Sequence, residues 1–514
     1  MTGLERLASS VLCVGFPGDA PDAAVLAELR ELVPGGVILF GRNVSTPERT
    51  RGLVDAVGAA LGNAPPPIVA IDQEGGRVMR LRRGTTASPS AMAVTAAGDP
   101  VLAERLGRAM AGDLRRIGVN LNFAPVLDLA LEPASTVIGT RAYSDSAARA
   151  AEFGTAMLRG LQGGGVGATL KHFPGHGATA TDSHAGLPIV GAALATLRAR
   201  ELVPFCAGIA AGVRAVMAGH IIATALDPDL PASLSPRVLT GLLRDELGFD
   251  GLIVTDCLQM DAIARSVGTA RGAVLALAAG ADGLTISHDL AVARAARDAI
   301  VAAVERGEVP RARLEAASAA MLRFRSAAAG ATATDTPAPD GEIAGMIAQR
   351  AVTLVRGRIA LRSDVPLNVV SFEGGAGDGI AALAAERPEL HLALRRRRFR
   401  SDSLRVALEP SGEMIENLLG LIQAQAGRGL VIVMRRAHLH AAQRRAIDAL
   451  LAAAPDAILI SANEPFDVPC FTKARTVLCT YGDEEIMLEA LADVLAGTIE
   501  ASGRLPVTLG DVKI

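Results

Sequence analysis

Lysine, histidine and aspartate side chains gather in one short segment of this chain. Lys171, His172, His176, Asp182 and His184 fall within fourteen residues, although the whole protein of 514 residues has only eight histidines. An imidazole can deliver and recover a proton near neutral pH, and a neighbouring aspartate fixes its tautomer and raises its basicity. The segment therefore predicts acid–base chemistry, with Asp182 and His184 as a candidate proton-transfer pair.

The same side chains are also possible metal ligands, so a metal centre is the competing interpretation. Zinc sites usually show tighter spacing patterns on a helix or knuckle, and this segment matches none of them. We therefore expect no metal and no cofactor.

The residues around this segment indicate where it lies in the fold. The apolar run Val166–Leu170 precedes it and is typical of a buried strand, whereas Pro174, Gly175 and Gly177 disfavour regular structure. We expect the polar groups to lie on a loop at the C-terminal end of a strand, which is where α/β folds place their chemistry.

Strand-like apolar runs alternate with helical patterns, such as Val101–Ile117 and Ala147–Gly160, from the N-terminus to about Arg325. The eight candidate strands are Val11–Phe16, Gly36–Phe40, Pro67–Ile71, Val119–Phe123, Val166–Leu170, Ala215–Ala218, Leu252–Thr255 and Gly283–Ile286. Six of them end near ionisable side chains, which are Asp72, Asp128, Lys171 with His172, His220, Asp256 and His288. Eight strands in this length predict a (β/α)8 TIM-like barrel whose strand ends share one rim, a doubly wound sheet being the alternative.

A tract of small residues and prolines, Ala327–Asp340, predicts a linker after this barrel. We therefore divide the chain into a barrel over 1–326, a linker over 327–342 and a C-terminal domain over 343–514. That domain is expected to begin with a helix over Ile343–Leu354 and to carry a second one over Arg436–Ala454. Its candidate strands are Leu367–Phe372, Val406–Leu408, Leu430–Met434, Ala457–Ile460 and Thr476–Cys479. The alternation predicts a smaller parallel α/β sandwich.

Composition limits the classes of partner. The formal net charge of −3 predicts no bulk attraction to nucleic acid or to an anionic membrane. No apolar stretch approaches the roughly 18 residues that a membrane span needs. Five scattered cysteines fit reduced thiols, and the first residues lack the pattern of a secretion signal, so we expect a cytoplasmic location. Oligomeric state is left open.

Two carboxylates and an arginine are further candidates. Cleavage of a glycosidic bond needs a nucleophile or base on one side and a proton donor on the other, and Asp256 directly follows an apolar strand. Its alternative role is a helix N-cap. Asp72, in the run Asp72–Val78, can accept bonds from sugar hydroxyls, and Gly75 and Gly76 allow close backbone approach. Arg141 can clamp a hydroxyl or carboxylate, or can be an ordinary solvated arginine.

With these motifs in place, the chain resembles the β-N-acetylhexosaminidases of glycoside hydrolase family 3, bacterial enzymes that trim N-acetylglucosamine from peptidoglycan fragments. The resemblance rests on Gly35–Phe40, Asp72–Val78, Asn122–Asp128, Val137–Arg141, Lys171–Gly177 with Asp182–His184, and Val254–Met260. The Asp-Ser-His triplet is similar to the signature that separates this branch from the family's β-glucosidases. The C-terminal part resembles the family's α/β sandwich domain.

The resemblance implies that Asp256 is the nucleophile and that His184, oriented by Asp182, is the general acid/base. It further implies that the N-acetylglucosamine ring is held by Asp72, Arg141, Lys171 and His172. The implied activity is that of a retaining exo-β-N-acetylglucosaminidase of peptidoglycan recycling, working through a covalent glycosyl–aspartate. Its partner is a small carbohydrate that contains N-acetylglucosamine.

The chain departs from the family pattern at Ala178, where an acidic residue is common, and at Cys257, where a second aspartate often follows the nucleophile. We expect the Cys257 thiol to be packed and inert, because the neighbouring charge disfavours a thiolate. Two alternatives stay open. One is a phosphorylase, because a neutral imidazole repels phosphate less than a carboxylate would. The other is a non-catalytic protein that binds a sugar or wall fragment.

Overall fold

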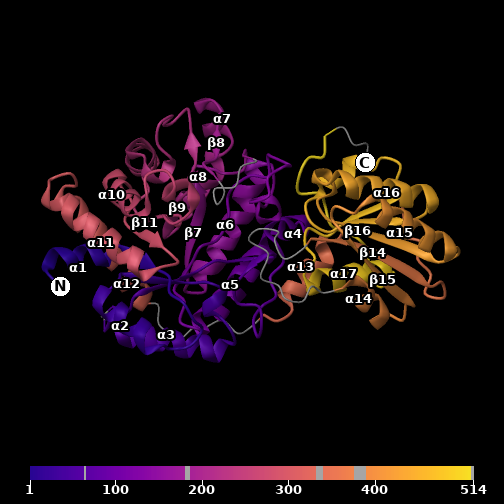
Figure 1. Ribbon diagram of the computed structural model, residues 1–514, viewed down its shortest axis with the longest axis horizontal. Helices are drawn as coiled ribbons and strands as arrows, with labels where there is room; N and C mark the ends of the chain where they lie inside the picture. The colour runs from indigo at the N-terminus through magenta and orange to yellow at the C-terminus, as the bar shows by residue number, and fades with distance from the viewer. Residues whose placement is uncertain (63–64, 180–185, 331–339, 375–388, 511–514) are drawn as a thin grey trace.

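The chain folds into two domains that lie side by side, as the computed structural model in Figure 1 shows. The structure describes residues 1–62, 65–179, 186–330, 340–374 and 389–510. The N-terminal domain is an eight-stranded parallel sheet surrounded by helices, and the C-terminal domain is a six-stranded sheet between two helical layers.

The eight strands of the first sheet form the expected barrel. Their order is β11-β9-β7-β6-β3-β2-β1-β12, and a bridge between Val254 and Gly283 brings β11 and β12 together. The strands are β1 Leu12–Val14, β2 Gly36–Leu39, β3 Ile68–Ile71, β6 Leu121–Asn122, β7 Gly167–Phe173, β9 Ala215–Ala218, β11 Leu252–Thr255 and β12 Leu284–Ile286. Each lies within or overlaps one of the eight strands predicted from the sequence.

The strands are buried on both faces, which is why their sequences are nearly continuous apolar runs. One set of apolar side chains fills the interior, among them Ile38, Leu121 and Val254. Helix α12 (Arg311–Gly330) adds Met321 and Phe324 to that set. These two side chains pack against Gly35, Gly167 and Gly283, which precede or begin their strands. Helix α12 therefore closes the amino-terminal end of the barrel, and only the carboxyl-terminal rim is left for a site.

Helices surround the barrel sheet. They are α1 Gly3–Ser10, α2 Ala23–Leu32, α3 Pro47–Leu61, α4 Ala91–Ala96, α5 Pro100–Arg116, α6 Ala147–Gly163, α7 Leu194–Ala199, α8 Leu202–Ala210, a π-type helix Arg237–Glu246, α9 Asp261–Ala264, α10 Thr269–Ala279 and α11 Leu290–Glu305. Short strands lie in the loops, namely β4 Gln73–Gly75, β5 Val78–Met79, β8 Ile189–Val190 and β10 Ile222–Ala223. Helices α5 and α6 pack closely because Gly107 and Gly160 leave no side chain between their backbones.

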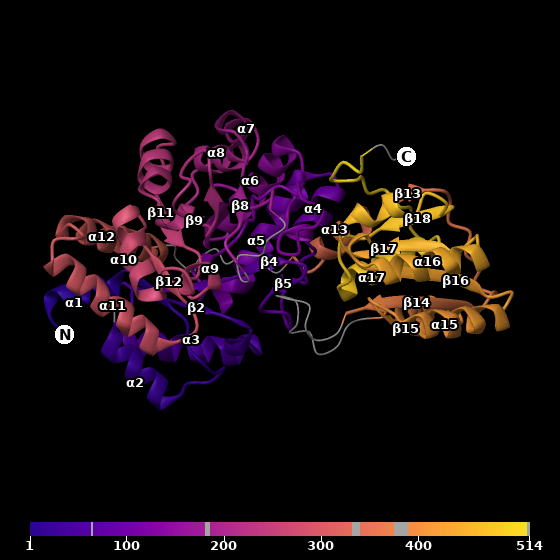
Figure 2. The same cartoon turned by 45° about the horizontal axis from the view of Figure 1, so that its top comes forward.

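The C-terminal domain has the sheet order β13-β18-β17-β16-β14-β15. Its strands are β13 Thr353–Arg356, β14 Leu367–Glu373, β15 Ser401–Ala407, β16 Gly429–Met434, β17 Ile458–Ser461 and β18 Thr476–Cys479. Its helices are α13 Ile343–Ala351, α14 Leu390–Arg396, α15 Gly412–Ala424, α16 Ala441–Ala453 and α17 Glu485–Leu495. Helices α13, α14 and α17 lie together on one face of the sheet, and α15 and α16 lie on the other (Figure 2).

The α/β sandwich is confirmed, but the prediction of a wholly parallel sheet is wrong at one edge. The first helix ends at Ala351 instead of Leu354, and residues Thr353–Arg356 form β13, which pairs antiparallel with β18. Their alternating burial is typical of an edge strand with one face on the core.

The predicted linker also begins later than expected. Helix α12 runs to Gly330, because Ala327–Ala329 favour a helix more than their small size favoured a linker. Residues 331–339 of that tract lie outside the described residues. Across the domain boundary, α13 packs on α4 and α5, and the hydroxyl of Ser90 donates to the carbonyl of Tyr481 at 2.6 Å.

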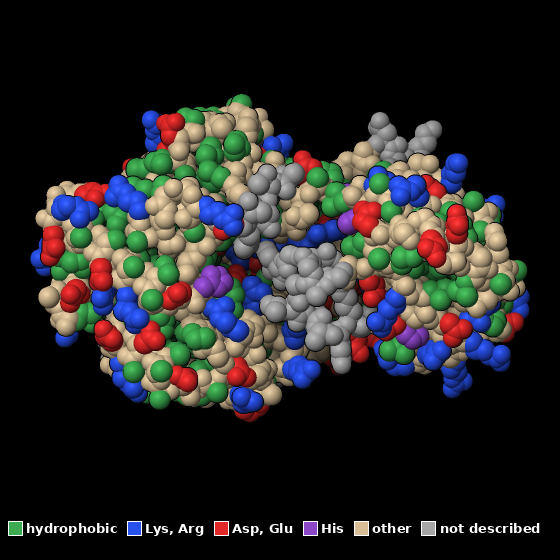
Figure 3. All heavy atoms as spheres, in the orientation of Figure 1, with side chains coloured by type: hydrophobic (Ala, Val, Ile, Leu, Met, Phe, Trp, Pro, Cys, Tyr) green, Lys and Arg blue, Asp and Glu red, His purple; other side chains and the backbone are tan. Residues whose placement is uncertain are grey.

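The described residues on the face drawn in Figure 3 show no large area of one charge. In Figure 3, basic and acidic side chains are interspersed over the visible face of both domains, which agrees with the near-neutral net charge. Within the described ranges, no helix is both long enough and apolar enough to cross a membrane.

Candidate active site

Strand β7, in the interior of the barrel sheet, carries two ionisable side chains at the carboxyl-terminal rim. Lys171 and His172 were expected on a loop, but the strand continues to Phe173. Both are therefore buried residues at its carboxyl end. Strand β7 pairs with β9 at Leu170 and again at Phe173, with a shift of register between them, and Lys171 forms a bridge with Val126 on the other side. Both side chains are therefore held by a rigid element.

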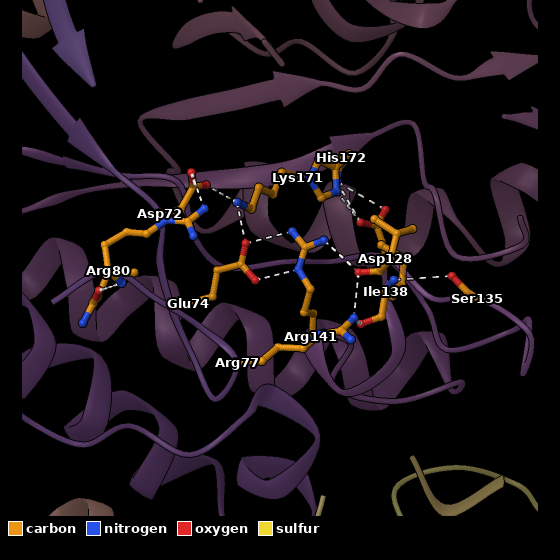
Figure 4. Close-up of polar contacts among 12 residues, drawn as sticks. Asp72, Glu74, Arg77, Arg80, Asp128, Ser135, Ile138, Arg141, Lys171 and His172 are labelled. Carbon is orange, nitrogen blue, oxygen red and sulfur yellow. Dashed lines mark hydrogen bonds and ion pairs between the residues drawn. The ribbon is translucent and has the colours of Figure 1, made fainter. Parts of the chain in front are cut away.

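Lys171 is the centre of a buried group of four charges, which we call the rim cluster (Asp72, Glu74, Arg141 and Lys171; Figure 4). Its Nζ lies 2.6 Å from Asp72 Oδ1 and 2.6 Å from Glu74 Oε1. Arg141 holds the same Glu74 with two parallel bonds, Nε to Oε2 and Nη2 to Oε1, each 2.8 Å long. Two cations and two carboxylates thus share one pocket of the rim, and three of the sequence-predicted binding residues meet there.

The charges of the rim cluster stabilise one another. Burial raises the pKa of Glu74, but the Arg141 guanidinium and the Lys171 ammonium lower it by more, so that pKa lies well below its usual range. Burial lowers the pKa of Lys171, but the Asp72 and Glu74 carboxylates outweigh it and raise that pKa. Glu74 is therefore a carboxylate and Lys171 an ammonium at neutral pH.

His172 has its own carboxylate, Asp128, in the loop that follows the neighbouring strand β6. The ring Nδ1 lies 2.6 Å from Asp128 Oδ2, and the backbone N–H of His176 donates to Oδ1 at 2.6 Å. A carboxylate can only accept, so Nδ1 carries the hydrogen and Nε2 is the atom available for other contacts. Asp128 thus fixes the tautomer and orientation of the His172 ring.

His176 lies beside His172 with ring centroids 6.0 Å apart, and its Nδ1 is 2.7 Å from the hydroxyl of Thr179. Burial lowers its pKa, which favours a neutral ring. Gly177 packs against Leu129, where a Cβ would come within 1.8 Å of the carbonyl oxygen. The Lys171–Gly177 run therefore folds tightly back onto the Asp128 segment.

Asp256 is the first residue after β11 and is half-buried at the rim. Its Oδ1 accepts from the backbone N–H of Cys257 at 2.7 Å. It is not a helix cap, because α9 begins at Asp261 and Met260 occupies the N-cap position. His220, after β9, donates from Nε2 to the carbonyl of Cys257 at 2.9 Å and so anchors the backbone that carries Asp256.

The Cys257 thiol is packed, as expected, although the main reason differs. Burial raises its pKa first, and the charge of Asp256 adds a smaller contribution. Its Sγ lies 2.7 Å from the hydroxyl of Ser287. The buried thiol, with its raised pKa, is a poor nucleophile in this state.

The sequence interpretation missed Glu74 and gave Asp128 no role. Glu74 was visible in the Asp72–Val78 run, and the spacing of two residues from Asp72 indicates one side of an extended segment. The glycines of that run allow a close approach, and the group that approaches them is another segment of the chain. A Cβ on Gly75 would lie 2.4 Å from the carbonyl oxygen of Pro89, so the glycine permits packing on the Ser88–Ser90 segment.

An aromatic ring also lies at this rim. Phe40 follows β2, and its ring centroid is 5.8 Å from that of His288, which follows β12. The guanidinium carbons of Arg42 and Arg80 lie 4.9 Å and 5.4 Å from the centre of the Phe40 ring. The Phe40 ring is therefore packed among two guanidinium groups and an imidazole at this rim.

The predicted proton-transfer pair, Asp182 and His184, lies outside the described residues, as does part of its loop. Within the ranges that the structure describes, no group of three or more His, Cys, Asp or Glu side chains is arranged to hold a metal ion.

Comparison with known proteins places this rim in a family. The model of the glycosyl hydrolase family 3 N-terminal domain matches residues 9–324, which is the barrel. A β-hexosaminidase of Pseudomonas aeruginosa is 41% identical over 292 residues, covering 56% of this chain and 84% of that protein. The solved structure of a glycoside hydrolase family 3 β-N-acetylglucosaminidase from Paenibacillus sp. FPU-7 covers 99% of both chains at 35% identity, with a TM-score of 0.92.

A second solved structure is similar to part of this chain. The β-N-acetylhexosaminidase of Beutenbergia cavernae covers 63% of this chain and 99% of its own, at 28% identity and a TM-score of 0.59. The matched barrel model, the identities and the shared two-domain architecture agree with the resemblance seen in the motifs. The chain belongs to glycosyl hydrolase family 3.

Proposed function

We propose that this protein is a retaining exo-β-N-acetylglucosaminidase that releases terminal N-acetylglucosamine from peptidoglycan fragments or related glycosides. The broader assignment is firm: the chain is a glycoside hydrolase of the β-N-acetylhexosaminidase type, as the family and the names of its relatives indicate. The observation that carries the finer proposal is the rim itself. The ends of β3, β6, β7 and β11 deliver a sugar-binding cluster and a carboxylate to the same end of one barrel.

In this proposal the rim cluster recognises the sugar. The ammonium of Lys171 and the guanidinium of Arg141 donate to hydroxyl oxygens, and Asp72 accepts from a hydroxyl. His172 offers Nε2, because Asp128 occupies Nδ1. A pyranose carries donors and acceptors on every side, so such an alternating set of charged groups fits it and rejects apolar ligands.

Asp256 acts as the nucleophile in this proposal. Its carboxylate attacks the anomeric carbon, and the bond to the leaving oxygen breaks as protonated His184 transfers its proton to that oxygen. A covalent glycosyl–aspartate results. Neutral His184, oriented by Asp182, then takes a proton from water, whose oxygen displaces Asp256 and releases N-acetylglucosamine with its configuration retained.

The first experiment measures hydrolysis of an aryl β-N-acetylglucosaminide, with the aryl N-acetylgalactosaminide and glucoside as comparisons. We expect the N-acetylglucosaminide to be preferred and proton NMR to show the β-anomer as the first product. Asp256→Ala should lose several orders of magnitude in kcat. Asp261→Asn, which changes a carboxylate of α9 that pairs with Arg265, is the matched control. An Asp256→Ala protein with normal turnover would remove this residue from the mechanism.

A second experiment tests His184. His184→Ala should reduce the hydrolysis of a substrate with a good leaving group far less than that of one with a poor leaving group, because only the poor one depends on proton donation. Equal losses with both substrates would contradict the acid role.

The same proteins decide between water and phosphate as the acceptor. We expect free N-acetylglucosamine as the product both with and without inorganic phosphate. Formation of a sugar 1-phosphate in phosphate buffer would instead identify a phosphorylase.

A further inference from the structure

We propose that the C-terminal domain positions Arg141 for substrate by holding the backbone of the segment that precedes it. This segment, Pro133–Gly139, is called the clamped loop below. The inference deepens the proposed function and rests on it, since it assumes that Arg141 binds the sugar. It assigns Arg436, His438 and Glu464 of the second domain as positioning residues for a site that lies on the barrel.

Backbone carbonyl oxygens of the clamped loop accept hydrogen bonds from two arginines of the barrel. Arg77 of the barrel lies with Nη2 at 3.1, 3.0 and 3.2 Å from the carbonyl oxygens of Thr136, Val137 and Ile138 (Figure 4). Arg141 donates from Nη1 to the same carbonyl of Val137 at 2.9 Å. The loop backbone is therefore bonded directly to the Arg141 guanidinium, and a shift of the loop moves that guanidinium.

The second domain adds two more cations to this backbone. Arg436 lies with Nη2 at 3.5 Å from the carbonyl oxygen of Thr136, and His438 donates from Nε2 to that of Pro133 at 2.9 Å. Both residues come just after the carboxyl end of β16, a strand in the interior of the second sheet. The clamped loop is thus held from both domains.

His438 is held in the form that this contact requires. Its Nδ1 lies 2.7 Å from Asp467 Oδ1, and its Nε2 meets a carbonyl, which can only accept. Burial lowers the pKa of His438, but Asp467 and the Pro133 carbonyl outweigh it and raise that pKa. Both ring nitrogens therefore act as donors.

Glu464 fixes the Arg436 side chain and fills the space beside the loop. It pairs with Arg436 through two bonds of 3.1 Å, and only 3% of its side chain is exposed. Its carboxylate packs directly on Gly139, where a Cβ would come within 1.8 Å of Oε1. Gly139 has a φ of +48°, so the loop turns into Arg141 at the point where the second domain touches it.

The segment that follows Arg141 in the sequence is also held by the second domain. Arg149 donates from Nη1 to the carbonyl of Leu505 at 2.9 Å, and the backbone N–H of Thr508 donates to Asp145 at 2.7 Å. The hydroxyl of Ser144 donates to the carbonyl of Pro506. Contacts with the second domain therefore bracket Arg141 in sequence, although Arg141 itself bonds only barrel groups among the contacts described.

The test compares Glu464→Gln with Glu489→Gln in the full-length protein. Glu489 is a matched control, because it pairs with Arg396 and Arg397 inside the second domain. We expect Glu464→Gln to raise both KM for an aryl N-acetylglucosaminide and the inhibition constant of N-acetylglucosamine about tenfold, with a smaller change in kcat. Glu489→Gln should change neither constant. A Glu464→Gln protein with wild-type constants would overturn the proposal.

A double-mutant cycle separates positioning from a general loss of structure. If Glu464 acts through Arg141, then Glu464→Gln should have little further effect on the inhibition constant in an Arg141→Lys background. Independent, multiplying effects would mean that Glu464 only stabilises the fold, and would contradict the proposal. Arg436→Lys, which keeps the charge, should bind sugar better than Arg436→Met.

The outcome also distinguishes this inference from the proposed function. If Arg141→Lys weakens sugar binding but Glu464→Gln does not, the function stands and the clamped loop is not controlled by the second domain. If Arg141→Lys leaves sugar binding unchanged, the assignment of Arg141 fails, and the role of the second domain fails with it.

Discussion

Two buried groups of charges lie on either side of the clamped loop, and they are built from the same chemical parts. The rim cluster pairs Lys171 and Arg141 with two carboxylates of the barrel. The second group, which we call the interface cluster, is Arg77, Arg436 and Glu464 and spans both domains. Both contain carboxylates whose pKa is held low by arginines, yet only one faces the barrel rim.

The difference lies in what the cations bind. In the interface cluster, Arg77 donates to backbone carbonyls, and Arg436 adds a longer contact to one of them besides its pair with Glu464, so the cluster ties segments together. In the rim cluster, Lys171 and Arg141 bind carboxylates, which under the proposed function exchange partners with sugar hydroxyls. A buried ion pair by itself therefore does not identify a ligand site. The acceptors that surround its cations decide whether the pair can bind a ligand or only holds segments of the chain together.

The largest expected contrast is between removing a cation from each cluster. Lys171→Met removes the buried ammonium between Asp72 and Glu74, which keep Arg80 and Arg141 as partners, so we expect about 3 kcal/mol lower stability and loss of hydrolysis. The Arg436 side chain is 20% exposed, and its partner Glu464 still has the Arg77 cation nearby. Arg436→Met should therefore lower the free energy of unfolding by about 1–2 kcal/mol. Urea unfolding followed by circular dichroism measures both. Equal losses would show that the two clusters do not differ in burial cost.

Acid should weaken the interface cluster in a defined range of pH. Burial raises the pKa of Glu464, but Arg436 and Arg77 lower it to about 2 from a usual 4.5. A depressed carboxyl pKa adds stability above the unfolded value, and this stability is lost as pH falls from about 4.5 to 2. Its full size is on the order of 3 kcal/mol. Glu464→Gln should be less stable at pH 7 and should show a shallower fall in that range, measured against Glu489→Gln.

Glu484, twenty positions further along the chain, should respond to pH in the opposite sense. Burial and the charge of Asp483 raise its pKa to about 7, and its Oε2 is buried without a hydrogen-bond partner among the described residues. The folded state then binds more protons than the unfolded state between pH 4.5 and 7, so stability falls as pH rises. Glu484→Gln should add roughly 1 kcal/mol above pH 7 and almost nothing at pH 4.5. A variant that is less stable than wild type at pH 8 would contradict this.

The smallest effect is expected at the surface. Arg475 and Asp456 form an ion pair with side chains 65% and 87% exposed. Arg475→Ala should change stability by less than about 0.5 kcal/mol and leave KM unaltered. A larger change would mean that exposed pairs of the second domain also contribute to its docking.

Much of the barrel and part of its rim were predictable from local patterns. Apolar runs located the eight strands, because a parallel sheet buries both faces of each strand, and the polar residues after them located Lys171, His172 and Asp256 at one end. The position of Lys171 in relation to Asp72 needed only the rule that strand ends converge. Asp182 and His184 stay predictions.

The interface cluster was not predictable in this way. Arg77, Arg436 and Glu464 come from three distant segments, and each looks like an ordinary surface charge in its own neighbourhood. Nothing local indicates that two domains dock there. The antiparallel strand Thr353–Arg356 was missed for a similar reason, since its pairing with β18 is set by residues more than a hundred positions away.

The balance of charge in the rim cluster has a consequence for ionic strength. The two cations and two carboxylates of this cluster partly cancel at longer range, although Arg80 lies 3.7 Å from Asp72 as a further cation. Under the proposed function, the ligand that approaches them is a neutral sugar. Mobile salt ions screen exposed charges but act weakly on buried pairs. Affinity for the sugar is accordingly set by the angles and lengths of short contacts, and it should stay nearly constant from dilute buffer to concentrated brine.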